Sequence, residues 1–226
     1  MKQTLITISA VGFSMIASQG AAIAVSDASF ESNPDIGGGW SNDLTPDWSE
    51  RGGPNNGDAF EEEIAGFSAE GARHVGVNNS SYIWQDTGVP YAANTRYTLA
   101  LAAGNRAGQT GAGNLSTYGL LDGTTNLGVA MYATSADVTA DATLTQASAQ
   151  FDAFANVTQG SFGDAPDLTF TTGAVAPAGN VVIFLGADGL GRSHFDNISL
   201  DATAIPEPAS ALLGALSALA LLRRRR

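Results

Sequence analysis

The sequence has no cysteine and only two histidines, His74 and His194. The lack of cysteine excludes disulfide bonds, thiolate nucleophiles and cysteine-ligated metals. The histidines lie far apart in the sequence, and neither belongs to a zinc-protease motif or a nucleophile elbow. A P-loop and a dinucleotide-binding fingerprint are absent as well. These absences favour a protein without catalytic activity.

Basic residues are also scarce. The chain carries 10 Lys plus Arg against 22 Asp plus Glu, a net charge of −12, and Lys2 and the last four arginines lie at its ends. Residues 25–204 therefore hold 5 arginines, no lysine and 21 acidic residues, a net charge of −16. Such an acidic surface repels phosphate backbones, which excludes nucleic acid as a partner. It suits an exported protein or one that collects divalent cations.

The length of 226 residues predicts one globular domain with additional segments at its ends. At the N-terminus, Lys2 precedes an apolar stretch from Leu5 to Ala17 and an Ala-x-Ala site at Ala22–Ala24. This order is typical of a secretory signal peptide, so residues 1–24 are predicted to form a signal helix that is removed on export. A buried N-terminal helix is the alternative.

The C-terminal segment, residues 205–226, has three parts. They are the motif Pro206, Glu207 and Pro208, the apolar run Ala209–Leu222, and the cluster Arg223, Arg224, Arg225 and Arg226. As a helix, the 14-residue run would measure about 21 Å, which is less than a hydrocarbon core of about 30 Å. It predicts a short transmembrane helix with its arginines on the cytoplasmic side. An ordinary tail anchor is the plainer alternative.

These three parts resemble the PEP-CTERM sorting signal in their order, helix length and terminal arginines. The resemblance implies an exosortase as the processing partner and a Gram-negative bacterium that makes extracellular polysaccharide. It also implies export across the inner membrane to the cell envelope, surface or extracellular matrix, with a transient membrane anchor. It says nothing about activity.

Residues 25–204 consist of short alternating runs separated by Gly, Asn, Asp and Pro. In Thr95–Ala102, Tyr97, Leu99 and Leu101 share one face, which is the period of a half-buried strand. Similar runs occupy 73–77, 82–86, 115–121, 127–132, 149–154, 168–171, 181–185 and 194–200. This series predicts an all-β domain, an antiparallel β-sandwich or jelly roll. We expect a long loop at 35–57 and an irregular strand pair at 133–148, and leave 58–64 open between a helical turn and a strand.

Short motifs in this domain resemble galactose-binding-like jelly rolls, the fold of many carbohydrate-binding modules. Ala28–Glu31 followed by Gly39-Trp40 resembles their opening strand, and Phe195–Leu200 resembles their closing strand. The resemblance implies a structural Ca²⁺ ion held by Glu31 and Asp196, with backbone carbonyls completing its about six to eight oxygen ligands. The alternative is that Glu31 is a solvated strand end and that Asp196 caps a turn.

The same resemblance implies that exposed rings bind polysaccharide, because an aromatic ring packs on the apolar face of a sugar. The candidate ligand-binding rings are Trp48, Trp40, Tyr82 and Trp84. Tyr82 and Trp84 also have the pattern of core residues, whereas Trp48 lies in a predicted loop and is expected to be exposed.

Together these patterns predict an exported, non-catalytic surface or matrix protein that binds carbohydrate. One alternative is a purely structural biofilm protein that associates through calcium. A glycan-active enzyme has the least support, because acidic residues are numerous enough for a carboxylate pair to arise by chance.

Overall fold

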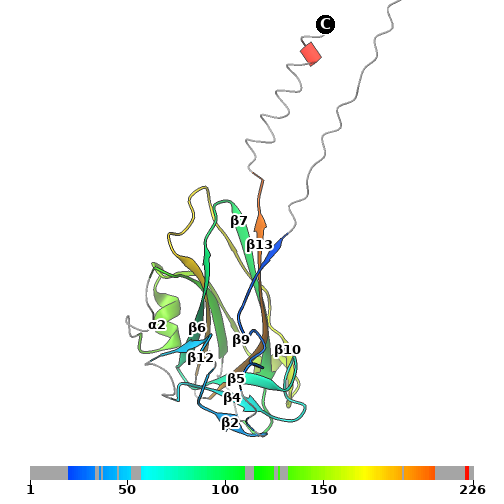
Figure 1. The fold of residues 1–226 in the computed structure, drawn as a ribbon. Coiled ribbons are helices and arrows are strands. Elements are labelled where there is room, and N and C mark those ends of the chain that lie inside the picture. The colour runs from blue at the N-terminus through cyan, green and yellow to red at the C-terminus, as the bar shows by residue number, and fades with distance from the viewer. Residues whose placement is uncertain are drawn as a thin grey trace, which may run out of the picture.

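The chain folds into a sandwich of two antiparallel β-sheets that face each other across an apolar core (Figure 1). This computed structural model describes residues 20–33, 36, 38–44, 46–51, 57–109, 115–124, 127, 132–189, 191–206 and 222–223. The antiparallel sandwich predicted from the sequence is confirmed. Within those ranges, no helix is long and apolar enough to span a membrane.

The eight-stranded sheet carries the candidate site. Its order is β10 (Ser161–Asp164), β7 (Thr95–Asn105), β13 (Ser193–Ala204), β5 (Arg73–Val77), β4 (Ala59–Glu63) and β2 (Trp40–Ser41). Two further strands pair outside this path, β1 (Ala21–Ile23) with β13 and β11 (Leu168–Thr171) with β7. This order brings β5 beside β13, although the two strands are far apart in the sequence.

The five-stranded sheet forms the second layer. Its order is β3 (Ser49–Glu50), β6 (Tyr82–Pro90), β12 (Asn180–Asp188), β8 (Leu115–Asp122) and β9 (Thr145–Phe151). The helix α2 (Ser135–Ala140) lies against the outer side of this sheet (Figure 1).

The core lies between the sheets and follows from the alternation within each strand. In β7, Tyr97, Leu99 and Leu101 point inward, as the period of two predicts. They belong to the same apolar cluster as Leu120 of β8 and Ile183 of β12. The alternate residues of the eight-stranded sheet therefore point outward, and these residues form the candidate site.

Residues 133–148 do not form the expected irregular strand pair. Thr134 and Asp137 make a capping box, in which each side chain accepts the backbone N–H of the other residue. This reciprocal capping starts α2, and only the later part of the segment forms a strand, β9. The strand predicted at 149–154 also ends early, because Asp152 caps the short helix α3 (Ala153–Asn156).

The other boundaries differ from the predictions in smaller ways. Residues 58–64, left open by the sequence, contain the strand β4. The long loop expected at 35–57 contains the two-residue strands β2 and β3. The strand predicted at 127–132 falls mostly outside the described residues.

The two ends of the chain are described only in part. Ala21–Ile23, assigned by the sequence to the signal peptide, forms β1 and pairs with Leu200–Ala202 of β13. Removal of residues 1–24 on export stays a prediction. Pro206 and Arg223 are exposed, whereas Glu207, Pro208, Arg224, Arg225 and Arg226 lie outside the described residues, as does nearly all of the predicted transmembrane helix.

Candidate functional site

The outer face of the eight-stranded sheet brings Glu62, His74 and His194 together. In β5, Val75 points into the core, so its neighbour His74 points outward. In β13, the inward-pointing Phe195 likewise leaves His194 on the outer face. Glu62 of β4 stands directly opposite His74 in the strand register.

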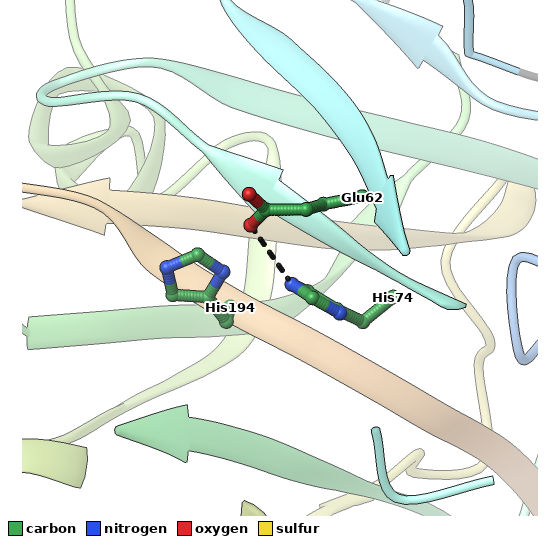
Figure 2. Close-up of side chains that lie close together, drawn as sticks. All are labelled: Glu62, His74 and His194. Atoms are coloured by element: carbon green, nitrogen blue, oxygen red, sulfur yellow. Dashed lines mark ion pairs between the residues drawn. The ribbon is translucent and has the colours of Figure 1, made fainter. Parts of the chain in front are cut away.

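Figure 2 shows the three side chains pointing into one space from three neighbouring strands, with an ion pair between Glu62 and His74. Glu62 Oε2 lies 3.4 Å from His74 Nε2, and Glu62 Oε1 accepts a 2.6 Å bond from Arg106. The two histidine rings meet edge to face with their centroids 5.1 Å apart. We call Glu62, His74 and His194 the histidine cluster.

Two glycines make room for the rings around this cluster. The register places His194 between Gly76 of β5 and Gly104 of β7. A Cβ atom on Gly76 would stand 2.1 Å from the ring of Phe60, and one on Gly104 would stand 2.8 Å from the ring of Phe67. Any larger residue at these positions would force the rings away from the sheet.

Aromatic rings enclose the cluster. The ring centroid of Phe67 lies 4.9 Å from that of His74 and 5.5 Å from that of His194. Phe162 lies 4.7 Å from Phe67 and 5.3 Å from His74, again between ring centroids. Both histidines are 0% exposed and Glu62 is 4% exposed. The cluster is therefore an acid–imidazole group shielded from water.

Several polar atoms of the cluster have no hydrogen-bond partner within the described part of the chain. They are both ring nitrogens of His74, Nδ1 of His194 and Oε2 of Glu62. Buried polar groups in native proteins are nearly always satisfied, so such a concentration marks a site kept for function. Burial, together with the nearby His74 and Arg106 side chains, holds the pKa of His194 well below its usual range. The His194 ring is therefore neutral.

The loop that carries Phe67, residues 64–72, is fastened by Asp196. One carboxylate oxygen of Asp196 accepts the backbone N–H groups of Ala69 at 2.6 Å and Glu70 at 3.0 Å. Burial raises the pKa of Asp196 to about 6, and these N–H groups limit the rise. Asp196 thus holds the loop closed over the histidine cluster.

Glu31 fastens the end of the same loop. Its Oε1 atom accepts the backbone N–H groups of Ala72 and Arg73, each at 2.7 Å. The structure therefore brings Glu31 and Asp196, the predicted calcium ligands, to one loop. The backbone is left-handed next to each of them, with φ of 56° at Phe30 and 50° at Asn197. Such conformations in non-glycine residues cluster at functional sites.

The predicted sugar platform is not formed, and the expected exposure of Trp48 is wrong. Trp48 is only 4% exposed, because its ring packs 5.3 Å from that of Phe30 and its indole N–H donates to the carbonyl of Asp27. The predicted loop folds back onto the core and takes the tryptophan with it.

The other three rings lie apart from Trp48. Trp40 is 64% exposed on the edge strand β2. Tyr82 is fully buried on the outer side of the five-stranded sheet, where it packs against Trp84 and Phe184 at centroid distances of 5.8 and 5.6 Å. The four rings share no common surface.

A cavity of about 310 Å³ opens on the outer side of the five-stranded sheet beside Trp84. Asp86 and Asp122 contribute its carboxylates, and each accepts a backbone N–H, from Gly88 and Thr124 respectively. Among the described residues, this cavity has no buried side-chain atom without a partner. The histidine cluster is therefore the stronger candidate site.

The histidine cluster was not predicted, because His74 and His194 lie far apart along the chain. A signal was present: each histidine precedes an inward-pointing core residue, so both face outward. What alternation does not encode is the strand order, which makes β5 and β13 neighbours.

A buried acid–imidazole group inside an aromatic enclosure is the kind of site that enzymes use. The protein-family model described as HpiC1-like, HpiC1 cyclase, matches residues 21–201. The chain therefore belongs to the HpiC1-like family. None of the curated proteins matches this chain.

Two solved cyclases share the fold. The Stig cyclase Fisc from Fischerella sp. TAU, in complex with (3Z)-3-(1-methyl-2-pyrrolidinylidene)-3H-indole, has 18% identity and a TM-score of 0.61, covering 83% of this chain and 100% of that chain. A cyclase from Fischerella sp. TAU in complex with 4-(1H-indol-3-yl)butan-2-one has 18% identity and a TM-score of 0.60, with coverage of 83% and 100%. At such identity the similarity establishes the fold.

These findings correct the functional predictions. The family is HpiC1-like and not a PEP-CTERM or carbohydrate-binding jelly-roll family, which overturns the biofilm assignment as well. Processing by an exosortase and export to the cell envelope are not tested by this match, which ends at residue 201, and stay predictions. Membership of a cyclase family overturns the non-catalytic carbohydrate binder, the structural surface protein and the glycan-active enzyme. The non-catalytic prediction failed because the lack of a linear catalytic motif was taken as the lack of catalysis.

Proposed function

We propose that this protein is a cyclase whose reaction takes place at the histidine cluster. The family match carries the proposal, because residues 21–201 contain the whole cluster and the strands that build it. The enclosure of the cluster by Phe60, Phe67 and Phe162 supports this location.

An apolar, unsaturated substrate with an indole-type ring fits this enclosure best. The two similar cyclases were solved with indole-containing ligands. Phenylalanine rings favour edge-to-face or offset contacts with another aromatic ring, and they stabilise a positive charge that develops over their faces. A sugar would lose its hydration here without gaining enough hydrogen-bond partners.

Ring closure joins two carbons of one molecule, converts one π bond into a σ bond and leaves the mass unchanged. Addition of a proton to one alkene carbon makes the electrophile, attack by a second π bond closes the ring, and loss of a proton restores neutrality. Glu62 and His74, with 3.4 Å between Oε2 and Nε2, can hold that proton between them and take it back. Arg106 fixes the carboxylate through its other oxygen.

The loop at 64–72 controls access to the cluster. Phe67 is 4% exposed and its ring lies over both histidine rings, so the substrate enters when this loop opens. Closure behind the substrate keeps water away from a cationic intermediate, which water would otherwise capture.

The proposal is tested by incubating the full chain with an indole that bears a dienyl side chain and by following a product of unchanged mass by chromatography and NMR. Glu62→Gln should lower the rate by about 10²–10⁴-fold, the usual contribution of a general acid–base group. Glu63→Gln is the matched control, because Glu63 pairs with Arg73 on the other face of β4. An unchanged rate in Glu62→Gln would refute the assignment of the site.

We propose in addition that Glu31 and Asp196 hold a Ca²⁺ ion that stiffens the loop at 64–72. The observations that support it are the convergence of both carboxylates on this loop and the left-handed residues beside them. Glu31 is exposed, and the two backbone N–H groups are held by its Oε1 atom, so a cation can reach Oε2. Backbone carbonyls would supply the remaining oxygen ligands.

The calcium proposal is tested by thermal unfolding of the full chain in CaCl₂ and in EGTA. Calcium at 100 times its Kd should raise the Tm by roughly 5–10 °C in the wild type, and Glu31→Gln should abolish the rise. The control Asp152→Asn, which removes a carboxylate charge elsewhere and keeps an oxygen that can cap α3, should keep the rise. Equal Tm values in calcium and EGTA would exclude the ion.

A further inference from the structure

The histidine cluster also has the composition and spacing of a metal site. Glu62, His74 and His194 each offer one ligand atom, and these three atoms all lie within 4.8 Å of one another. All three residues are buried. Two imidazoles with one carboxylate are a common ligand set for divalent transition metals, including catalytic zinc with an open fourth position.

We propose that these three side chains bind one divalent transition-metal ion, with Zn²⁺ as the best-matched ion. The unpartnered nitrogens are the observation that points to a ligand. Both ring nitrogens of His74 and Nδ1 of His194 lack hydrogen-bond partners among the described residues, and both rings are fully buried. A bound ion would satisfy lone pairs that the protein leaves without a donor.

The distances suit a small ion. Bonds of about 2.0–2.1 Å in a tetrahedral site place neighbouring ligand atoms roughly 3.3–3.4 Å apart. The observed distance between Glu62 Oε2 and His74 Nε2 is 3.4 Å, which already equals one edge of such a tetrahedron. The His194 ligand atom lies within 4.8 Å of the other two, so it is the only one that has to approach.

Neighbouring groups orient the ligands in the manner of an outer coordination shell. Arg106 binds Glu62 Oε1 at 2.6 Å and so leaves Oε2 directed at His74. The side chain of Gln109 lies 3.3 Å from His194 Nε2, which fixes the orientation of that ring. Such second contacts hold imidazole and carboxylate ligands in position in known metal sites.

The charges that face the site set its strength. Arg106 and Arg192 are the cations near His194, and both oppose a divalent ion. Glu62 is the one acidic ligand among the three. We therefore expect one ion per chain, bound more weakly than in a structural zinc site with four protein ligands.

The metal site does not depend on the proposed cyclisation, because ion binding is measured without any substrate. If the metal site and the cyclase reaction both exist at this cluster, the ion and the catalytic proton occupy the same lone pairs of Glu62 and His74. Zn²⁺ then inhibits the cyclase, and a chelator restores its rate.

The test uses the full chain and ZnCl₂ alone. Isothermal titration should give one Zn²⁺ per chain, and a concentration 100 times the Kd should raise the Tm by roughly 5–10 °C. His74→Asn and His194→Asn should each lose the tight site and the Tm rise. Asp141→Asn, which changes the carboxylate at the C-terminal end of α2, should keep both. Unchanged stoichiometry in both histidine variants would overturn the proposal.

A second measurement avoids the risk that the histidine variants misfold. Zinc X-ray absorption of the wild-type protein should show two imidazole ligands, and ¹⁵N NMR should shift the signals of both histidines, the only ones in the chain. A shell of oxygen ligands alone would mean that Zn²⁺ binds surface carboxylates of this acidic chain, which overturns the proposal. Absence of Zn²⁺ binding would overturn it too, and would leave the cyclase assignment untouched.

Discussion

The outer faces of the two sheets are both largely buried, but they are buried by different chemistry. On the five-stranded sheet, Tyr82 and Phe184 pack with Val138 of α2 in one apolar cluster. Its polar groups have partners: Ser135 donates to the carbonyl of Ala187, and the Tyr82 hydroxyl donates to a backbone carbonyl. This face has the properties of an ordinary core.

The outer face of the eight-stranded sheet differs in the satisfaction of its polar atoms. It buries a carboxylate and two imidazoles whose nitrogens lack partners within the described residues. Leaving a buried polar group unpaired costs about 1–3 kcal/mol. The comparison teaches that the first face contributes stability, whereas the second gives up stability for chemistry.

The largest effect is expected from Phe184→Ala on the stabilising face. Phe184 is 0% exposed, so its removal leaves a cavity and should lower the free energy of unfolding by about 3–5 kcal/mol in urea denaturation. Val89→Ala is the control. Val89 is 38% exposed, so its truncation should change the free energy of unfolding little. A loss below about 1 kcal/mol for Phe184→Ala would show that this face is not a core.

Gly76→Ala should have the next largest effect, on the functional face. The added Cβ would stand 2.1 Å from the Phe60 ring, so the ring must move away from His194 at a cost of about 1–3 kcal/mol. Gly173→Ala is the matched control, since nothing lies within 4 Å of its Cβ position. Equal urea midpoints for the two variants would argue against a packed enclosure.

His194→Leu should stabilise the protein by about 1 kcal/mol while abolishing cyclase activity, because it replaces a buried polar ring with an apolar side chain. The measurement is urea unfolding in the presence of a chelator, paired with the activity assay. Leu120→Met, a swap within the core, provides the control for volume change alone. A marked destabilisation by His194→Leu would contradict the idea that stability is given up at this face.

The smallest effect concerns the pH dependence near α2. Hydrogen bonds from Tyr132 and then Thr143 lower the pKa of Asp141 to about 2. This pKa lies below the value of about 3.9 in the unfolded chain, so the ionised Asp141 carboxylate stabilises the folded protein. The stabilisation is present above pH 4 and is lost as the pH falls towards 2. Tyr132→Phe should raise the Asp141 pKa, as measured by carboxyl ¹³C NMR. An unchanged pKa would show that the bond does not exist in solution.

Much of the fold could be predicted from the sequence, because alternation is a local property. The inward positions Tyr97, Leu99 and Leu101 are correct, and strands were found where β5, β6, β8, β11, β12 and β13 lie. The helix α2 was missed, because its six residues give too short a pattern and the Thr134–Asp137 cap decides its start.

The site could be predicted only in part. The resemblance implied that Glu31 and Asp196 lie near each other as calcium ligands. In the structure both carboxylates hydrogen-bond to the loop at 64–72, and calcium binding stays a proposal. The histidine cluster was out of reach, because His74 and His194 meet only through the pairing of β5 with β13. The burial of Trp48 depends in the same way on how a loop folds over the core.

The most direct test of the account uses the fact that His74 and His194 are the only histidines in the chain. With ¹³C-labelled histidine, the full protein gives one ring signal for each. Addition of 4-(1H-indol-3-yl)butan-2-one, the ligand of a similar cyclase, should shift both signals in a saturable manner. Saturable binding that leaves both histidine signals unmoved would place the ligand elsewhere and contradict the assignment of the cyclase site to this cluster.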